Sequence, residues 1–327
     1  MLSVVMDHCS KRWLVGIQQT QVYNFIFLSQ MPIFMFVAGY FFYNNYIKEY
    51  SIYQICKKII NYFKSFLIPF FSFVIISTVI NLDFKNFITN IVNAVLIPEK
   101  SLWFLWALMW IEIMMLLAFF ISKKLFREVL KGFWKVCTSI AVYGCLLIPI
   151  LGMYLKWPLY FETKLIIYYS IFFVVGLLFR VLSSQFKGLC DKRVIVMILL
   201  TSFIIVGIIM YNHPRILFEN ESIINMISRI IGSIAAIFLV WSIATLVSKK
   251  QSVVKLSKCG AYSLELYYMH SVLLCLPIFS NYLRFNSSIT NVLAYLTLYC
   301  AVIAISFLLI LILKKSKVLN IILFGKN

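Results

Sequence analysis

The stretch that decides the fold is ITNVLAYLTLYCAVIAISFLLILIL, residues 289–313, which contains no charged side chain over its whole length. A helix needs roughly 20 apolar residues to cross the hydrocarbon of a bilayer, whereas membrane barrels use short strands of alternating polarity. This run is long and does not alternate, so it predicts a membrane-spanning α-helix.

Further uncharged runs of the same kind precede this one along the chain. They lie near residues 22–42, 59–81, 101–122, 135–155, 164–182, 194–211, 223–247 and 258–280. Residues 1–8 are expected to be the last part of another helix, because about 12 Å of helix is too short to cross alone. We therefore expect an all-α, polytopic transmembrane bundle with nine full spans and an incomplete first helix, forming one domain over residues 1–327.

The composition agrees with this interpretation. Hydrophobic residues make up 63% of the chain and charged residues 13%, against about 45–50% and 25% in ordinary soluble domains. A soluble globular protein, a disordered chain and a small disulfide-rich secreted domain are excluded. The eight cysteines lie mostly in apolar segments without metal-ligand spacing, so we expect neither a metal site nor a permanently bound cofactor.

The excess of basic residues, 30 Lys and Arg against 11 Asp and Glu, is distributed unevenly between alternate loops. Twenty of them lie in one set of loops, at residues 43–58, 121–135, 180–193, 248–258 and 314–327, and only eight in the other. Cytoplasmic loops carry such an excess, so the first set and the C-terminus are expected to be cytoplasmic. The basicity therefore indicates topology in a bilayer rather than a nucleic-acid partner, and it also suits a cytoplasmic ligand with phosphates.

Few strongly polar side chains fall inside the predicted spans, where each costs about 2.5–3.5 kcal/mol and tends to be functional. They are Asp7, His8, Lys64, Glu112, Arg229, Glu265 and His270. Lys64 lies near a helix end, from which it can reach water. Glu112 and Glu265 are expected to pair with Arg229 or a hydroxyl group, with a catalytic role as the alternative.

His270 lies roughly 18 Å into the predicted helix that begins near Lys258. Tyr267 and Ser263, three and seven residues before it, share its helix face. His8 is expected at a similar depth, so the two imidazoles could line one cavity and take a proton from a hydroxyl nucleophile. The alternatives are a hydrogen bond from His270 to a neighbouring helix, and a merely polar His8 near a chain end.

Pro32 interrupts the second predicted span beside two polar residues, Ser29 and Gln30. Proline cannot donate to the carbonyl of Leu28, so a kink is expected there. Kinks with polar neighbours often line cavities in membrane proteins, although purely structural kinks are equally common.

Six stretches of the chain form a set of motifs: VVMDHCS (4–10), QMPIFMFVAGYFF (30–42), FKSFLIPFF (63–71), SLWFLWAL (101–108), FFVVGLLFR (172–180) and KCGAYSLELYYMH (258–270). Together they resemble the acyltransferase 3 family of integral-membrane acyltransferases. They occur in the order and at the spacing of the family, from one end of the chain to the other.

The resemblance implies roles for individual residues. His8 matches the histidine expected to be catalytic, and Ser263, Tyr267 and His270 match a second motif, with His270 as a further catalytic candidate. Substrate-binding or supporting roles fall by the resemblance on Tyr267, Ser263, Gln30 and Trp103. The same roles are expected for Arg229, Glu112 and Glu265, because they are strongly polar residues inside predicted spans. Gln30 stands where a histidine is frequent. The family's basic residue ten positions before its first histidine has no counterpart, since only seven residues precede His8.

The resemblance implies a bacterial inner-membrane O-acyltransferase. Its donor would be acetyl-CoA or another acyl-CoA, and its acceptor a hydroxyl of a surface polysaccharide, a lipid-linked sugar or another glycan precursor. A polysaccharide exporter without acyl-transfer chemistry is the alternative from another class, and a structural membrane subunit is the third.

Overall fold

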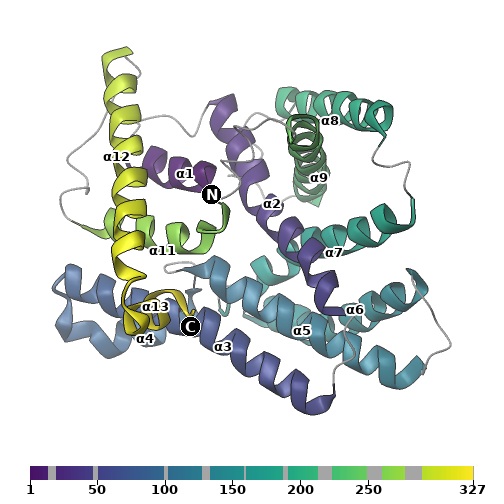
Figure 1. Cartoon of the computed structure of the whole chain (residues 1–327), viewed down its shortest axis with the longest axis horizontal. Coiled ribbons are helices and arrows are strands. Elements are labelled where there is room, and N and C mark those ends of the chain that lie inside the picture. Colours follow the sequence, from purple (N-terminus) through teal and green to yellow (C-terminus); the bar gives the residue numbers. More distant parts are fainter. Residues whose placement is uncertain are drawn as a thin grey trace. The chain divides into compact units, whose positions relative to one another are not determined.

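The computed structural model describes residues 1–13, 20–46, 51–98, 102–126, 133–157, 160–186, 191–212, 223–248, 260–276 and 289–326. Within these ranges the chain forms twelve α-helices and one short 3-10 helix, without a strand. The prediction of an all-α polytopic bundle is confirmed (Figure 1).

Eight of the described helices are long and apolar enough to cross a membrane. They are α2 (Gln21–Tyr46), α3 (Ile52–Ile80), α5 (Trp103–Phe126), α6 (Phe133–Lys156), α7 (Thr163–Gln185), α8 (Lys192–Asn212), α9 (Ile223–Val247) and α12 (Ile289–Leu313). Each corresponds to one of the nine spans expected from the uncharged runs.

The remaining expected span, 258–280, contains a shorter helix, α11 (Ser263–Cys275). Its 13 residues cover about 20 Å, less than the roughly 30 Å of bilayer hydrocarbon. The helix ends where Leu276 adopts an extended conformation (φ −65°, ψ 137°), as expected for a residue that precedes a proline. Residues 258–259 and 277–280 of this prediction lie outside the described residues.

The first helix, α1, runs over Leu2–Trp13, five residues beyond the end expected at His8. The residues after His8 are mostly polar, so the hydropathy pattern did not predict that the helix continues. In the structure they have partners: Ser10 bonds Tyr295, Lys11 pairs with Asp7, and Arg12 donates to a backbone carbonyl. The apolar side chains of Cys9 and Trp13 are fully buried, so the helix continues through the polar segment.

The chain divides into two compact units, and the division falls within α2. The first unit holds residues 1–34 and 187–313, and the second holds residues 35–186 and 314–327. In the first unit α1, α11 and α12 pack together, and α8 packs along α9.

In the first unit, α9 supplies the hydrogen bond that Pro32 cannot make. The hydroxyl of Ser233 on α9 donates to the carbonyl of Leu28 over 2.8 Å, and Ser233 is completely buried. Gly232 allows this approach, because an added Cβ there would lie 3.1 Å from the Leu28 side chain and 3.3 Å from Ile209 on α8. A hydroxyl from a neighbouring helix thus satisfies the backbone group that a membrane proline leaves free.

In the second unit, α5 is the most deeply buried of the eight candidate spans, and it packs against α3, α6 and α7. The short α4 (Phe87–Leu96) and α13 (Lys317–Phe324) both pack on α3.

The second unit also brings α2 and α7 into backbone contact through two glycines. An added Cβ at Gly39 would collide with the carbonyl of Phe173, and one at Gly176 would collide with the carbonyl of Phe36. Near these glycines, Arg180 donates to the Tyr40 hydroxyl over 2.7 Å and lies over the tyrosine ring. Small residues at helix interfaces permit this close packing in membranes.

Gly39→Ala and Gly176→Ala should each destabilise the protein by about 2–3 kcal/mol, because the two backbones must separate to admit a methyl group. Gly144→Ala on α6 is the matched control, since nothing lies within 4 Å of its added Cβ; it should be neutral or stabilising by up to ~1 kcal/mol. Thermal unfolding in detergent measures all three. Equal melting temperatures for the three variants would contradict the glycine contact.

Ser233→Ala should cost about 1–2 kcal/mol, because it leaves the buried Leu28 carbonyl without a donor. In a Pro32→Ala background, residue 32 gains a backbone N–H that donates to the carbonyl of Leu28. Ser233→Ala should then cost much less. A double-mutant cycle measured by equilibrium unfolding should give a coupling of about 1 kcal/mol between the two positions. Additive effects would show that Ser233 does not compensate for the proline.

Candidate active site

The two histidines proposed for catalysis, His8 on α1 and His270 on α11, lie side by side in the first unit. Their ring centroids are 5.3 Å apart and the rings are tilted by 53°. His270 is completely buried, whereas His8 is only partly buried. The structure thus brings together two imidazoles that are 262 residues apart in the chain.

A second contact sets the direction of α1 along α11. The guanidinium of Arg12 donates to the carbonyl of Leu274 in the last turn of α11. Arg12 follows His8 by four residues, as Leu274 follows His270, so one turn of each helix runs in the same direction. The contact also supplies a donor to one of the carbonyls that a helix end leaves unpaired.

The helix α12 holds α1 from another side (Figure 1). The hydroxyl of Tyr295 lies 2.8 Å from that of Ser10 and donates to the carbonyl of Met6 over 3.2 Å. One turn further along α12, the hydroxyl of Tyr299 donates to the carbonyl of Leu2 over 3.0 Å. The two tyrosines thus bond carbonyls in successive turns of α1.

The hydrogen bonding of His270 determines which ring nitrogen can accept a proton. Its Nδ1 lies 2.8 Å from the carbonyl oxygen of Leu266. A carbonyl only accepts, so Nδ1 carries the hydrogen and the neutral ring has its lone pair on Nε2. This Nε2 is buried and has no hydrogen-bond partner among the described residues. His270 therefore presents a buried proton acceptor next to His8.

Two other residues predicted for the site, Tyr267 and Ser263, precede His270 on α11. The ring of Tyr267 is 5.8 Å from that of His270, as their spacing predicts. Ser263 is the first residue of the helix and is half-buried. Of these two residues, Tyr267 is the one whose ring contacts His270 in the described structure.

Glu265 is completely buried on α11, and Arg229 is half-buried on α9. Both side chains make polar or electrostatic interactions within the protein. Supporting or substrate-binding roles for both residues stay predictions.

Gln30 supports α1 through Asp7. Its side-chain amide donates to the Asp7 carboxylate over 3.0 Å, and Lys11 pairs with the same oxygen over 3.1 Å. Asp7 is 2% exposed, and these two donors offset part of the cost of burying its charge. Asp7 directly precedes His8 but is committed to a different set of partners.

The remaining predicted residues, Trp103 and Glu112, belong to the second unit. Trp103 at the start of α5 stacks on Tyr169 of α7, with ring centroids 5.2 Å apart. Glu112, further along α5, lies within the electrostatic influence of Lys58 on α3. A role in binding substrate stays a prediction for both residues.

Sequence reasoning missed Arg12 and Tyr295 as residues that position His8. For Arg12 a signal existed, because it follows His8 by one helical turn and would share its face. Tyr295 lies in an apolar run and contacts α1 across most of the chain length, so no local pattern could have identified it.

The fold and the histidine pair define a multi-pass helical membrane protein with a buried proton acceptor. The chain belongs to the acyltransferase 3 family, whose model, described as an acyltransferase domain, matches residues 1–311. The match extends over both compact units and includes both histidines. No curated protein and no solved structure matches the chain.

Proposed function

We propose that the protein is a bacterial inner-membrane O-acyltransferase. It transfers an acyl group, in the first instance acetyl from acetyl-CoA, to a hydroxyl of a surface polysaccharide or its precursor. Membership of the acyltransferase family supports acyl transfer. The observation that carries the proposal is the contact between His8 and His270, whose Nε2 is a buried acceptor.

In the proposed reaction, the acceptor hydroxyl attacks the thioester carbonyl while His8 removes its proton. In this step the ring of His8 turns so that its N–H donates to Nε2 of His270, which has no partner in the described structure, and the other nitrogen of His8 presents a lone pair to the acceptor. When the tetrahedral intermediate collapses, the C–S bond breaks and His8 returns the proton to the CoA thiolate. His270 therefore orients His8, and its own tautomer is fixed by Leu266. A covalent acyl-histidine step at His8 is the other route for the same group.

Tyr267 is the residue we assign to the oxyanion or to the acceptor sugar. It is 3% exposed and its ring lies next to His270. A phenolic hydroxyl in such an enclosed site can donate to the negative charge that develops on the thioester oxygen.

The charge distribution supports a cytoplasmic donor. Twenty of the 30 Lys and Arg residues lie in one set of loops, together with the C-terminal segment. Such loops are cytoplasmic by the positive-inside rule, and their charge would attract the phosphates of CoA.

His8→Ala should lower acylation by about 100-fold or more, because it removes the general base. His270→Ala should also lower it, whereas His270→Gln, which can place an acceptor near Nε2, should retain more activity than His270→Ala. O-acetyl content of the surface polysaccharide, measured by NMR in a complemented deletion strain, gives the readout. Immunoblotting of membranes shows that each variant is present.

Ser271→Ala is the matched control on α11, because its hydroxyl donates only within its own helix, to the carbonyl of Tyr267. It should acetylate as the wild type does. Retained acetylation in His8→Ala would overturn the assignment of the base. Loss of the polymer from the surface, with accumulation inside the deletion strain, would indicate export instead.

A further inference from the structure

In the second unit, the C-terminal helix α13 is held against the middle of the membrane-spanning helix α3. Gly325 ends α13 in the left-handed conformation (φ 64°). An added Cβ at Gly325 would lie 2.7 Å from the backbone of Ser65 on α3, and the side chains of Leu323 and Phe324 are buried. The last turn of α13 is therefore fixed at the level of Ser65.

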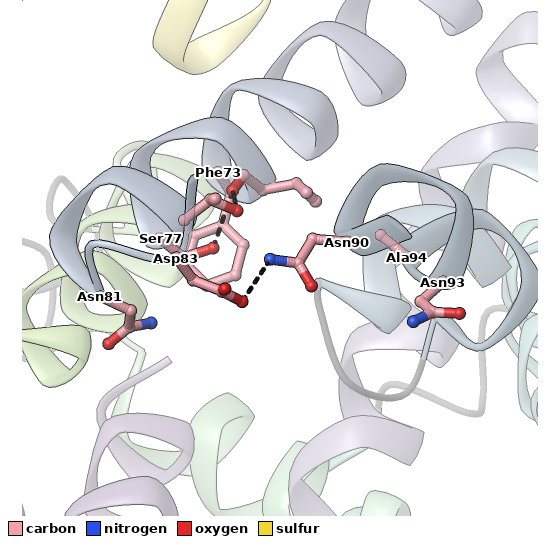
Figure 2. A pocket seen from close by; sticks show the side chains of 9 residues that line it. Phe73, Ser77, Asn81, Asp83, Asn90, Asn93 and Ala94 are labelled. Carbon is pink, nitrogen blue, oxygen red and sulfur yellow. Dashed lines mark hydrogen bonds between the residues drawn. The ribbon is translucent and has the colours of Figure 1, made fainter. Parts of the chain in front are cut away.

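Ser65 lies at one end of the part of α3 that can cross the hydrocarbon of a bilayer. Residues 65–82 contain no charged side chain, and a run of about this length is enough to span the membrane. Lys64 directly precedes the run and is exposed, and Asp83 follows it. At the Asp83 end, the carboxylate accepts a hydrogen bond from Asn90 of α4 over 3.0 Å, as Figure 2 shows. The contact at Ser65 thus places α13 at the other membrane surface, next to Lys64.

Helix α13 turns apolar side chains away from the protein. Val318, Leu319 and Ile322 are 63%, 38% and 43% exposed, and their spacing puts them on one face of the helix. A short helix with an exposed apolar face and flanking lysines lies in the interface of a membrane. The other short helix on α3, α4, also exposes Ile88 and Val92, but it contains no charged residue. The two helices therefore differ in charge rather than in apolar surface.

The charged residues around α13 are all positive. Residues 314–327 contain four lysines and neither Asp nor Glu, and lysines are also the only charged residues in the first half of α3, residues 52–66. Lys64, Lys315 and Lys317 are exposed, and they make no hydrogen bond or ion pair with the described part of the chain. A basic cluster of this kind, directly beside a spanning helix, attracts anionic lipids.

We propose that α13 and the adjoining turn of α3 form a binding surface for the anionic phospholipids of the surrounding bilayer. In this lysine surface, Lys64, Lys315 and Lys317 contact headgroup phosphates, and the apolar face of α13 inserts beneath them. The bilayer is the partner because α13 is packed on a spanning helix at the level where its uncharged run begins. The lysine surface belongs to the second unit and the histidine pair to the first, and lipid binding does not depend on acyl-transfer chemistry.

Hydrogen exchange of the full-length protein in nanodiscs, followed by mass spectrometry, tests the proposal. Nanodiscs of phosphatidylcholine are compared with nanodiscs that also contain phosphatidylglycerol. The anionic lipid should slow exchange of the α13 amides about fivefold or more, because binding stabilises the docked helix, and high salt should weaken this effect. Lys315→Gln/Lys317→Gln should remove most of the slowing. Lys192→Gln/Arg193→Gln is the charge-matched control, since it removes two exposed cations at the start of α8, and it should keep the full effect.

A second variant, Val318→Ala/Ile322→Ala, tests insertion of the apolar face. It should speed exchange of α13 in the anionic nanodiscs although alanine favours a helix, and unchanged or slower exchange would contradict insertion.

Equal exchange of wild-type α13 in the two lipid compositions overturns the proposal, as does slowing that Lys315→Gln/Lys317→Gln retains. An equal loss in the control variant also overturns it, because the effect then follows total charge rather than the lysine surface. Slowing that depends on the number of protein copies in a nanodisc, and not on the lipid, would show that a second copy covers α13 instead. No nanodisc contains acyl-CoA or a glycan, so failure here is distinguishable from failure of the transferase assignment.

Discussion

One hydrogen bond, from Nδ1 of His270 to the carbonyl of Leu266, determines what the candidate active site can do. It holds the hydrogen on Nδ1 and leaves the lone pair on a buried Nε2 that has no partner in the described chain. In a membrane interior such a group is costly unless it meets a donor. In the reaction proposed above, an N–H of His8 is this donor.

The other contacts of α1 hold His8 in its position. Helix α1 is short, and isolated helices of such a length are marginal in water, so its position depends on its neighbours. Arg12 aligns it with α11, Tyr295 and Tyr299 hold it to α12, and Gln30 on α2 donates to Asp7. These contacts join α1 to three other segments of the chain. These contacts therefore hold the proposed base, His8, next to His270 before any substrate enters.

The sequence predicted the features that depend on local composition. Eight spans were found because long uncharged runs reflect the bilayer itself, and His8 and His270 were found because buried histidines are rare and fell in family motifs. The end of α11 at Cys275 could have been predicted from the proline at position 277, whereas the end of α1 could not, because Arg12 and Ser10 are satisfied only by distant residues. The donor to Leu28 and the contact at Gly39 likewise depend on tertiary packing that no single segment encodes.

The most direct test of the account is the protonation state of His270 in the resting protein. The chain has three histidines, so solid-state ¹⁵N NMR of protein labelled at histidine, with a His270→Gln sample subtracted, isolates the signals of this ring. The account predicts a protonated Nδ1 and an unprotonated Nε2. A neutral ring protonated at Nε2 instead would contradict it, because His270 could then no longer accept the N–H of His8.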